Sequence, residues 1–268
     1  MLKDITLGQF FPGDSPIHKL DPRTKILSEI FIIIFVFLCN TPISFVFAVL
    51  SNILIIYVSR IHFSVVVKSI KPVLFLIIFT AIINLFLTSG DTYVIKWKFL
   101  SITTNGVSSA IVMALRIVLL VSFTSLLTFT TSPIMLTDGI ESLLKPFSKL
   151  GLPSHELAMM MTIALRFIPT LLEETDKIIM AQKSRGADFE NGSIVKRAKS
   201  LIPILVPLFI NSFRRADELA TAMECKCYRG GENRTRLKEL SYHFRDVVAG
   251  FIVLAFCTII IILGAFNI

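Results

Sequence analysis

The sequence predicts an all-α protein, a polytopic membrane helical bundle that also carries long cytoplasmic helices. Of its 268 residues, 54% are hydrophobic and only 17% are charged, whereas a soluble domain of this length has roughly a quarter charged residues. The charges are also segregated, because the segments 43–59, 72–88 and 247–268 contain none. Each segment is close to the ~17–25 residues with which a helix crosses the hydrocarbon layer.

Five spans are expected, and in chain order they cover residues 24–39, 43–59, 72–88, 105–129 and 247–268. The first holds only Lys25 and Glu29, both near its start, and ends at the turn Asn40-Thr41-Pro42. The fourth is interrupted by Arg116. We expect this arginine either near the headgroups or, as the favoured interpretation, in a structural pair inside the bundle.

The connecting segments differ in how much Lys and Arg they carry. Residues 1–25 carry four, 60–71 three and 132–246 seventeen. The alternate connections are poor in positive charge, with none in the 40–42 turn and two in 88–104. Because basic residues accumulate on the cytoplasmic side, this alternation predicts a multi-pass protein of the cell membrane with its N-terminus in the cytoplasm and its C-terminus outside.

The net charge of +8 does not indicate a nucleic-acid partner. The basic residues lie beside the spans, where anionic headgroups attract them, so the expected partner is the lipid membrane. Residues 1–25 lack the apolar region of a signal peptide and are expected to form a cytoplasmic lead-in. The four cysteines give neither a disulfide framework nor the Cys-x-x-Cys spacing of zinc sites, so no metal and no cofactor are expected.

The chain is expected to divide into residues 1–131 with the lead-in and the first four spans, a cytoplasmic domain 132–246, and a last span 247–268. The 115 residues of 132–246 are too many for a loop and too apolar for a solvated domain. After Pro133 we expect an amphipathic helix with Thr137 or Asp138 as its cap. Gly151 would end it.

A longer helix is expected from His155 to Ser184, because apolar residues recur there at three- and four-residue steps. Gly186 is well placed as its C-terminal cap. A second helix follows from the short apolar run 201–213 on to Cys225.

These two helices repeat one plan. Each has an apolar stretch, a charged last turn and a glycine break that holds a basic residue, and the two basic residues, Arg185 and Lys226, lie 41 positions apart. Two matching basic ends on the cytoplasmic side suggest docking onto two similar partners.

Four parts of the chain resemble the T components of energy-coupling-factor transporters. The matching segments are Gln182–Phe189 and Ala222–Arg236, which correspond to the family's two Ala-Arg-Gly signatures, Phe11–Ser15 with His18–Lys25 in the lead-in, and Leu136–Glu141 in mid-chain. The match is closest to the version that several vitamin-specific partners share. The resemblance covers nearly the whole chain.

The resemblance implies a transmembrane coupling subunit of an ATP-driven importer of vitamins or other micronutrients. Such a subunit works between two ABC-type ATPases and one small substrate-binding membrane subunit, the S component. The ATPases hydrolyse ATP, so the chain itself is not expected to be an enzyme and has no catalytic residues.

The family's motifs assign the ATPase contacts to two groups of residues. Ser184, Arg185 and Gly186 would carry the first contact, Cys225, Lys226 and Cys227 the second, with Tyr228, Arg229 and Gly230 as secondary candidates. The second group departs from Ala-Arg-Gly at all three positions, and lysine lacks the bidentate fork of arginine. The alternative for either cation is a surface charge that complements the helix dipole.

The competing function class is a self-contained secondary membrane transporter. It should show inverted repeats and charged or broken spans near the midplane, but four of the five expected spans have no interior charge. A chain that hydrolyses ATP itself should carry the phosphate-binding loop with its Gly-Lys dipeptide, and no Gly-Lys occurs in this sequence.

Overall fold

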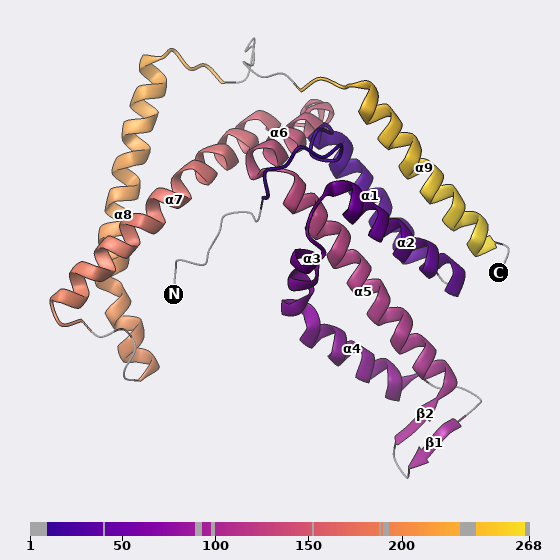
Figure 1. Cartoon of the computed structure of the whole chain (residues 1–268). Coiled ribbons are helices and arrows are strands. Elements are labelled where there is room, and N and C mark those ends of the chain that lie inside the picture. Colours follow the sequence, from indigo (N-terminus) through magenta and orange to yellow (C-terminus); the bar gives the residue numbers. More distant parts are fainter. Residues whose placement is uncertain are drawn as a thin grey trace. The chain divides into compact units, whose positions relative to one another are not determined.

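The computed structural model shows the predicted all-α fold (Figure 1). It describes residues 10–39, 41–88, 93–97, 100–151, 153–187, 189, 193–230 and 240–265. The α-helices are α1 (Pro22–Leu38), α2 (Pro42–Ser59), α3 (Phe63–Ile70), α4 (Leu74–Leu87), α5 (Thr104–Thr130), α6 (Pro133–Leu144), α7 (Ser154–Ser184), α8 (Ile194–Cys225) and α9 (Phe244–Ala265). Two short 3₁₀ helices, η1 (Lys71–Val73) and η2 (Lys145–Leu150), adjoin α3 and α6.

The connection between α4 and α5 contains a hairpin that the sequence did not lead us to expect. Strands β1 (Tyr93–Trp97) and β2 (Leu100–Thr103) pair antiparallel. Thr103 then caps α5, since its Oγ1 accepts a hydrogen bond from the Gly106 amide (3.0 Å) and donates one to the Thr88 carbonyl (2.8 Å). A Cβ at Gly106 would lie 2.8 Å from the carbonyl oxygen of Leu85, so the close approach of α4 to α5 requires glycine here.

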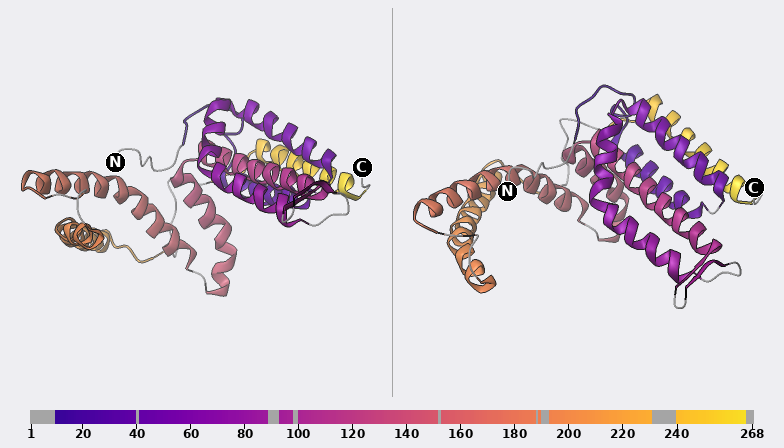
Figure 2. Two further views of the ribbon diagram at one scale, coloured as in Figure 1. Left: turned by 90° about the horizontal axis from the view of Figure 1, so that it is seen from below. Right: turned by 60° about the horizontal axis from the view of Figure 1, so that its bottom comes forward.

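The chain forms two compact units, divided within α6 after Gly139. The first, the bundle unit, holds α1–α5, the start of α6, and α9. In it α1, α2, α5 and α9 run side by side (Figure 2). The second, the arm unit, holds the rest of α6 with α7 and α8.

The core of the bundle unit lies where α1, α2, α5 and α9 meet. Its buried apolar side chains are Ile32, Val36, Cys39, Phe45, Ala48, Leu119, Phe123 and Ile260. Outward-facing apolar side chains are left open, such as Leu54 at 63% and Phe75 at 79% exposure. An apolar surface of this extent is suited to hydrocarbon rather than to water.

Within the described residues, five stretches are long and apolar enough to cross a membrane: Pro42–Ser59, Phe63–Leu87, Thr104–Thr130, Ser154–Ser184 and Phe244–Gly264. Four of these correspond to expected spans, and the fifth, α7, was expected in the cytoplasm. Its mean hydropathy of 1.2 is the lowest of the set. The expected first span, 24–39, is not in the set, because α1 has 17 residues and is shorter than all five. Its crossing therefore stays a prediction.

Arg116 has its partners inside the bundle, as the favoured interpretation expected. Its Nη2 donates to the carbonyl oxygen of Cys39 at 2.8 Å. The guanidinium also lies 5.8 Å from the ring centres of Phe37 and Phe45. Cys39 caps the end of α1, where backbone carbonyls lose their helical donors. Arg116 thus supplies one of those missing donors and ties α5 to α1.

The start of α6 corrects a prediction. The helix begins at Pro133, with Ser132 Oγ accepting from the Met135 amide at 3.3 Å. Thr137 and Asp138 lie inside the helix rather than at its cap, and the Thr137 hydroxyl donates to the Ile134 carbonyl. A serine followed by proline at the first helical position is the stronger start signal, because proline has no amide hydrogen to leave unpaired there.

Candidate functional site at two helix ends

The first predicted site forms the C-terminal end of α7. The helix stops at Ser184, and Gly186 has φ +83°. The Gly186 amide donates to the Lys183 carbonyl and the Ala187 amide to the Gln182 carbonyl, both at 3.0 Å. This pair of bonds defines the Schellman cap, in which a left-handed residue closes the helix. The prediction that Gly186 caps this helix is confirmed.

The second predicted site forms the end of α8 in the same way. The Cys227 amide donates to the Glu224 carbonyl at 2.8 Å, and the Tyr228 amide to the Met223 carbonyl at 3.0 Å. Cys227 has φ +55°. It therefore occupies the position that Gly186 has in the first cap, and Lys226 occupies the position of Arg185. The two ends share one local backbone structure.

The cap residue of the second end is strained. A residue with a Cβ in the left-handed region costs roughly 1–2 kcal/mol, a cost that glycine avoids. Gly230, one of the secondary candidates, also has a positive φ of +86°, with no atom within 4 Å of where a Cβ would stand. Tyr228 is half-buried and Arg229 is exposed. The second end thus has two left-handed residues, where the first has one within its described residues.

The residues of both ends are open to solvent. Ser184, Arg185, Gly186, Cys225, Lys226 and Cys227 are all exposed. Among the described residues, neither Arg185 nor Lys226 forms an ion pair. Each cation lies at the negative end of a helix dipole. Each can also form a charge-assisted hydrogen bond with a carboxylate of another molecule, and such a bond is stronger than one between neutral groups.

Helices α7 and α8 are fastened to each other by one carboxylate. Glu174 of α7 accepts a hydrogen bond from Asn211 Nδ2 at 2.5 Å and pairs with Arg215 Nη2 at 3.1 Å. Asn211 and Arg215 are four residues apart and so lie on the same face of α8. Figure 1 shows the two helices crossing, with their C-terminal ends pointing away from the crossing in different directions.

The crossing gives the two helices arms of equal length. Glu174 lies ten residues before the last residue of α7, Ser184, and Arg215 lies ten residues before the last residue of α8, Cys225. At 1.5 Å per residue each arm extends about 15 Å beyond the crossing. The arrangement presents two alike, exposed, basic ends on either side of one crossing.

The apolar run 201–213 belongs to one continuous helix, because α8 passes through both Pro203 and Pro207. Apart from the buried Ile204, most of its apolar side chains are exposed, among them Leu201, Ile202, Leu205, Val206, Phe209, Ile210 and Phe213. Such a face is suited to contact with another apolar surface.

The other segments of the resemblance have structural places in the bundle unit. His18 bridges the lead-in, with Nδ1 2.6 Å from Ser15 Oγ and Nε2 3.0 Å from the Phe11 carbonyl. Gly139 of the mid-chain pattern lets α6 approach α1, since a Cβ there would lie 3.0 Å from the Ile26 side chain. Asp188 and residues 231–236, which belong to the two signature matches, lie outside the described residues.

Sequence reasoning missed the polar partners of these segments. It gave no role to Glu174 or Asp246, because their partners lie 37 and 225 residues away along the chain. The only local signal is at Asp246, whose side chain accepts from the His243 amide three residues earlier, as a capping-box acid does.

Comparison with known proteins shows the family of this chain. Residues 13–237 match the model of the family described as cobalt transport protein. A relative from Clostridium kluyveri is 56% identical over 263 residues, 98% of this chain and 97% of its own length. One from Acidaminococcus fermentans is 56% identical over 255 residues, 95% of each chain, and one from Ruminiclostridium cellulolyticum 54% over 263 residues, 98% of each. All three are named energy-coupling factor transporter transmembrane proteins. The chain therefore belongs to this family and is a multi-pass transmembrane component of an energy-coupling factor transporter.

Proposed function

We propose that this chain couples ATP binding and hydrolysis in two partner ABC-type ATPases to a small substrate-binding membrane subunit that takes up a vitamin or another micronutrient. The observation that carries the proposal is the repeated cap. Two helix ends 41 residues apart share one backbone structure and place a cation at the same position. Two equivalent contacts from one chain are what two similar partner subunits require.

The crossing supports a mechanical role. Because Glu174 joins α7 to α8 through Asn211 and Arg215, a displacement of one arm is passed to the other instead of being absorbed by a loop. The exposed apolar face of α8 offers a surface for the substrate-binding subunit. In this proposal the N-terminus lies in the cytoplasm, the C-terminus outside, and α7 lies on the cytoplasmic side with the ATPases.

Co-purification tests the proposal. A tagged chain isolated in detergent from its own membranes should retain two ATPases and one small hydrophobic subunit, identified by mass spectrometry. A chain that is isolated alone and still transports a radiolabelled B vitamin after reconstitution would contradict the proposal, since it would then need no partner.

Charge reversal at the first helix end tests its role. Arg185→Glu should release an ATPase or abolish uptake while the chain stays inserted, because removing one partner of a buried charged contact typically costs ~2–5 kcal/mol. Lys177→Glu is the matched control, since Lys177 is an exposed lysine on the same helix. Retention of the ATPases and uptake of a panel of radiolabelled B vitamins are measured together. Uptake by Arg185→Glu at the level of the control would remove Arg185 from the site.

The second end makes a separate prediction. Lys226→Arg should keep or strengthen assembly and Lys226→Glu should weaken it, and the Arg185→Glu/Lys226→Glu double variant should lose more than either single variant. A solvated lysine would give changes within about ±0.5 kcal/mol. ATPase retention by the purified variants distinguishes the two cases. Full assembly with Lys226→Glu would leave Tyr228, Arg229 and Gly230 as the next candidates.

A further inference from the structure

We propose that four residues, Asp21, Arg23, Lys25 and Asp246, form a clamp. The clamp holds both ends of the cytoplasmic segment, the expected domain 132–246, to the bundle unit. It is the fixed point against which the two arms act. The inference rests on the proposed coupling function. It concerns the residues where the chain leaves α5 and where it enters α9, and all four clamp residues belong to the bundle unit.

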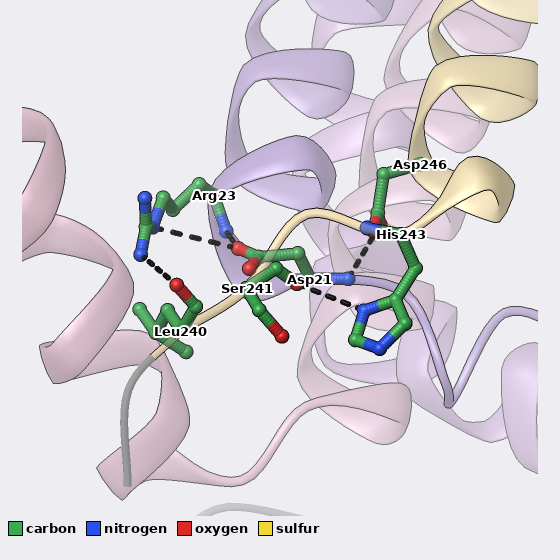
Figure 3. A network of polar contacts seen from close by, with 6 residues as sticks. All are labelled: Asp21, Arg23, Leu240, Ser241, His243 and Asp246. Atoms are coloured by element: carbon green, nitrogen blue, oxygen red, sulfur yellow. Dashed lines mark hydrogen bonds and ion pairs between the residues drawn. The ribbon is translucent and has the colours of Figure 1, made fainter.

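The returning end of the segment is held by Arg23 and Asp246 (Figure 3). Arg23 Nη2 donates to the Leu240 carbonyl at 2.9 Å, and the guanidinium lies 5.0 Å from the centre of the Tyr242 ring. Asp246, only 4% exposed, accepts from the Asp21 amide through Oδ1 at 2.7 Å and from the His243 amide through Oδ2 at 2.8 Å. One carboxylate therefore joins the start of α1 to the start of α9.

The departing end of the segment is held by Lys25, which is 6% exposed. Its Nζ donates to the carbonyl oxygens of Thr130 (3.0 Å) and His18 (3.2 Å) and to Thr131 Oγ1 (3.2 Å). All three donors of the ammonium group are thus used. Thr130 ends α5, and the backbone of Thr131 leads into α6.

Opposite charges lie close together in the clamp. The carboxylates of Asp21 and Asp246 supply the opposite charge to Lys25, and Arg23 Nε lies 3.7 Å from Asp21 Oδ1. Asp21 also caps α1 through the Arg23 amide at 2.9 Å. Asp21, Lys25 and Asp246 are buried and Arg23 is half-buried. Each of these charges would be more costly to bury without the opposite charges beside it.

The position of the clamp in the chain gives it its function. Three residues at alternate positions at the start of α1 contact both boundaries of a segment of more than 100 residues. Movement of the arms therefore reaches α1, α5 and α9 at one point and is passed on to the bundle. Without the clamp, each end of the segment could shift by itself, and the arms would move without moving the spans.

The test compares Arg23→Gln and Asp246→Asn with Arg245→Gln, a matched control because Arg245 is exposed beside the buried Asp246. In the purified complex, both clamp variants should retain the ATPases and hydrolyse ATP within about twofold of wild type, while uptake of the panel of radiolabelled B vitamins falls at least about tenfold. Uptake equal to that of the control would overturn the inference.

Hydrogen exchange gives a measurement that needs no partner subunit. In the isolated chain, amides of residues 240–246 should lose protection in both clamp variants and keep it in Arg245→Gln. A wild-type chain that retained no ATPases would contradict the proposed function but not the clamp. Unchanged exchange in both variants would contradict the clamp. Should Asp246→Asn fail to assemble, Arg23→Gln decides alone, because it leaves Asp246 in place. Reduced uptake with assembly intact supports the clamp, and any other result overturns it.

Discussion

Cys227 occupies a backbone position that favours glycine. Gly186 holds the equivalent position in the first cap with φ +83°, whereas Cys227 has φ +55°. The hydrogen bonds of the cap form in both cases. At Cys227 they form together with a strained, left-handed backbone. The conformational cost thus falls on the second end only.

Replacing Cys227 tests this strain. Cys227→Gly should stabilise the helix end by roughly 1 kcal/mol, and Cys227→Val should destabilise it, because a β-branched side chain is the worst fit to a left-handed backbone. Cys225→Gly is the control, since Cys225 is the last residue of α8 and gains nothing from glycine. The thermal midpoint of the purified chain in detergent is measured. Equal midpoints for Cys227→Gly and Cys227→Val would contradict the left-handed cap.

At this scale the sequence predicted the cap glycine and the correspondence of Arg185 with Lys226, because both follow from local patterns. It could not predict that Cys227 takes the place of glycine, since a left-handed cysteine is uncommon and has no sequence signal. Nor could it identify two of the three partners of Lys25, Thr130 and Thr131, which lie 105 and 106 residues away. Contacts of that range depend on packing.

At the scale of elements, Glu174 is the carboxylate that joins α7 to α8 among the described residues. Glu174 is 18% exposed and receives both the amide of Asn211 and the guanidinium of Arg215. Because these donors come from one helix face, the contact fixes the position of α8 along α7 as well as its direction.

Removing the Glu174 side chain should therefore loosen the crossing. We expect Glu174→Ala to lower the free energy of unfolding by about 1–3 kcal/mol, because the two donors lose their acceptor. Glu173→Ala is the matched control, one residue earlier and exposed. A double-mutant cycle with Arg215→Ala, followed by thermal unfolding in detergent, isolates the pair. Additive losses would show that the ion pair contributes nothing.

Most helices could be predicted from hydropathy and from glycine stops, but their starts and connections less well. The start of α6 was misplaced because Thr137 and Asp138 are good caps in isolation, while Ser132 and Pro133 form the actual one. The β1–β2 hairpin was missed because the connection 88–104 had been interpreted only from its number of Lys and Arg residues. The continuity of α8 through Pro203 and Pro207 shows that prolines near one helix face need not end it.

For the whole molecule, the order in which the chain crosses the membrane depends on α7. Its length and composition allow a crossing, yet the helix is the least hydrophobic of the five candidates. Charge distribution and the contacts of Glu174 favour a position outside the hydrocarbon layer, because an ion pair within the layer would be costly. In the proposed topology the ends of α7 and α8 lie on the cytoplasmic side.

Accessibility to an impermeant thiol reagent decides the order. In intact cells a cysteine introduced by Thr92→Cys, a position outside the described residues, should react, and one introduced by Ser193→Cys should not. Labelling after the membrane is opened is the control that both cysteines are reactive. Reaction at position 193 in intact cells would place α7 across the membrane, and equal labelling at both positions would reject the five predicted spans.

The equal arms also bear on symmetry. A single chain has no rotation axis, but α7 and α8 cross near the tenth residue before each end and carry the same cap. The two helix ends of the arm unit therefore have a local pseudo-twofold symmetry, which suits the two similar partner subunits that we propose. The glycine in one cap and the cysteine in the other break that pseudo-symmetry chemically. Two identical partners could thus bind in equivalent poses with unequal strength, and two different partners could each select its own arm.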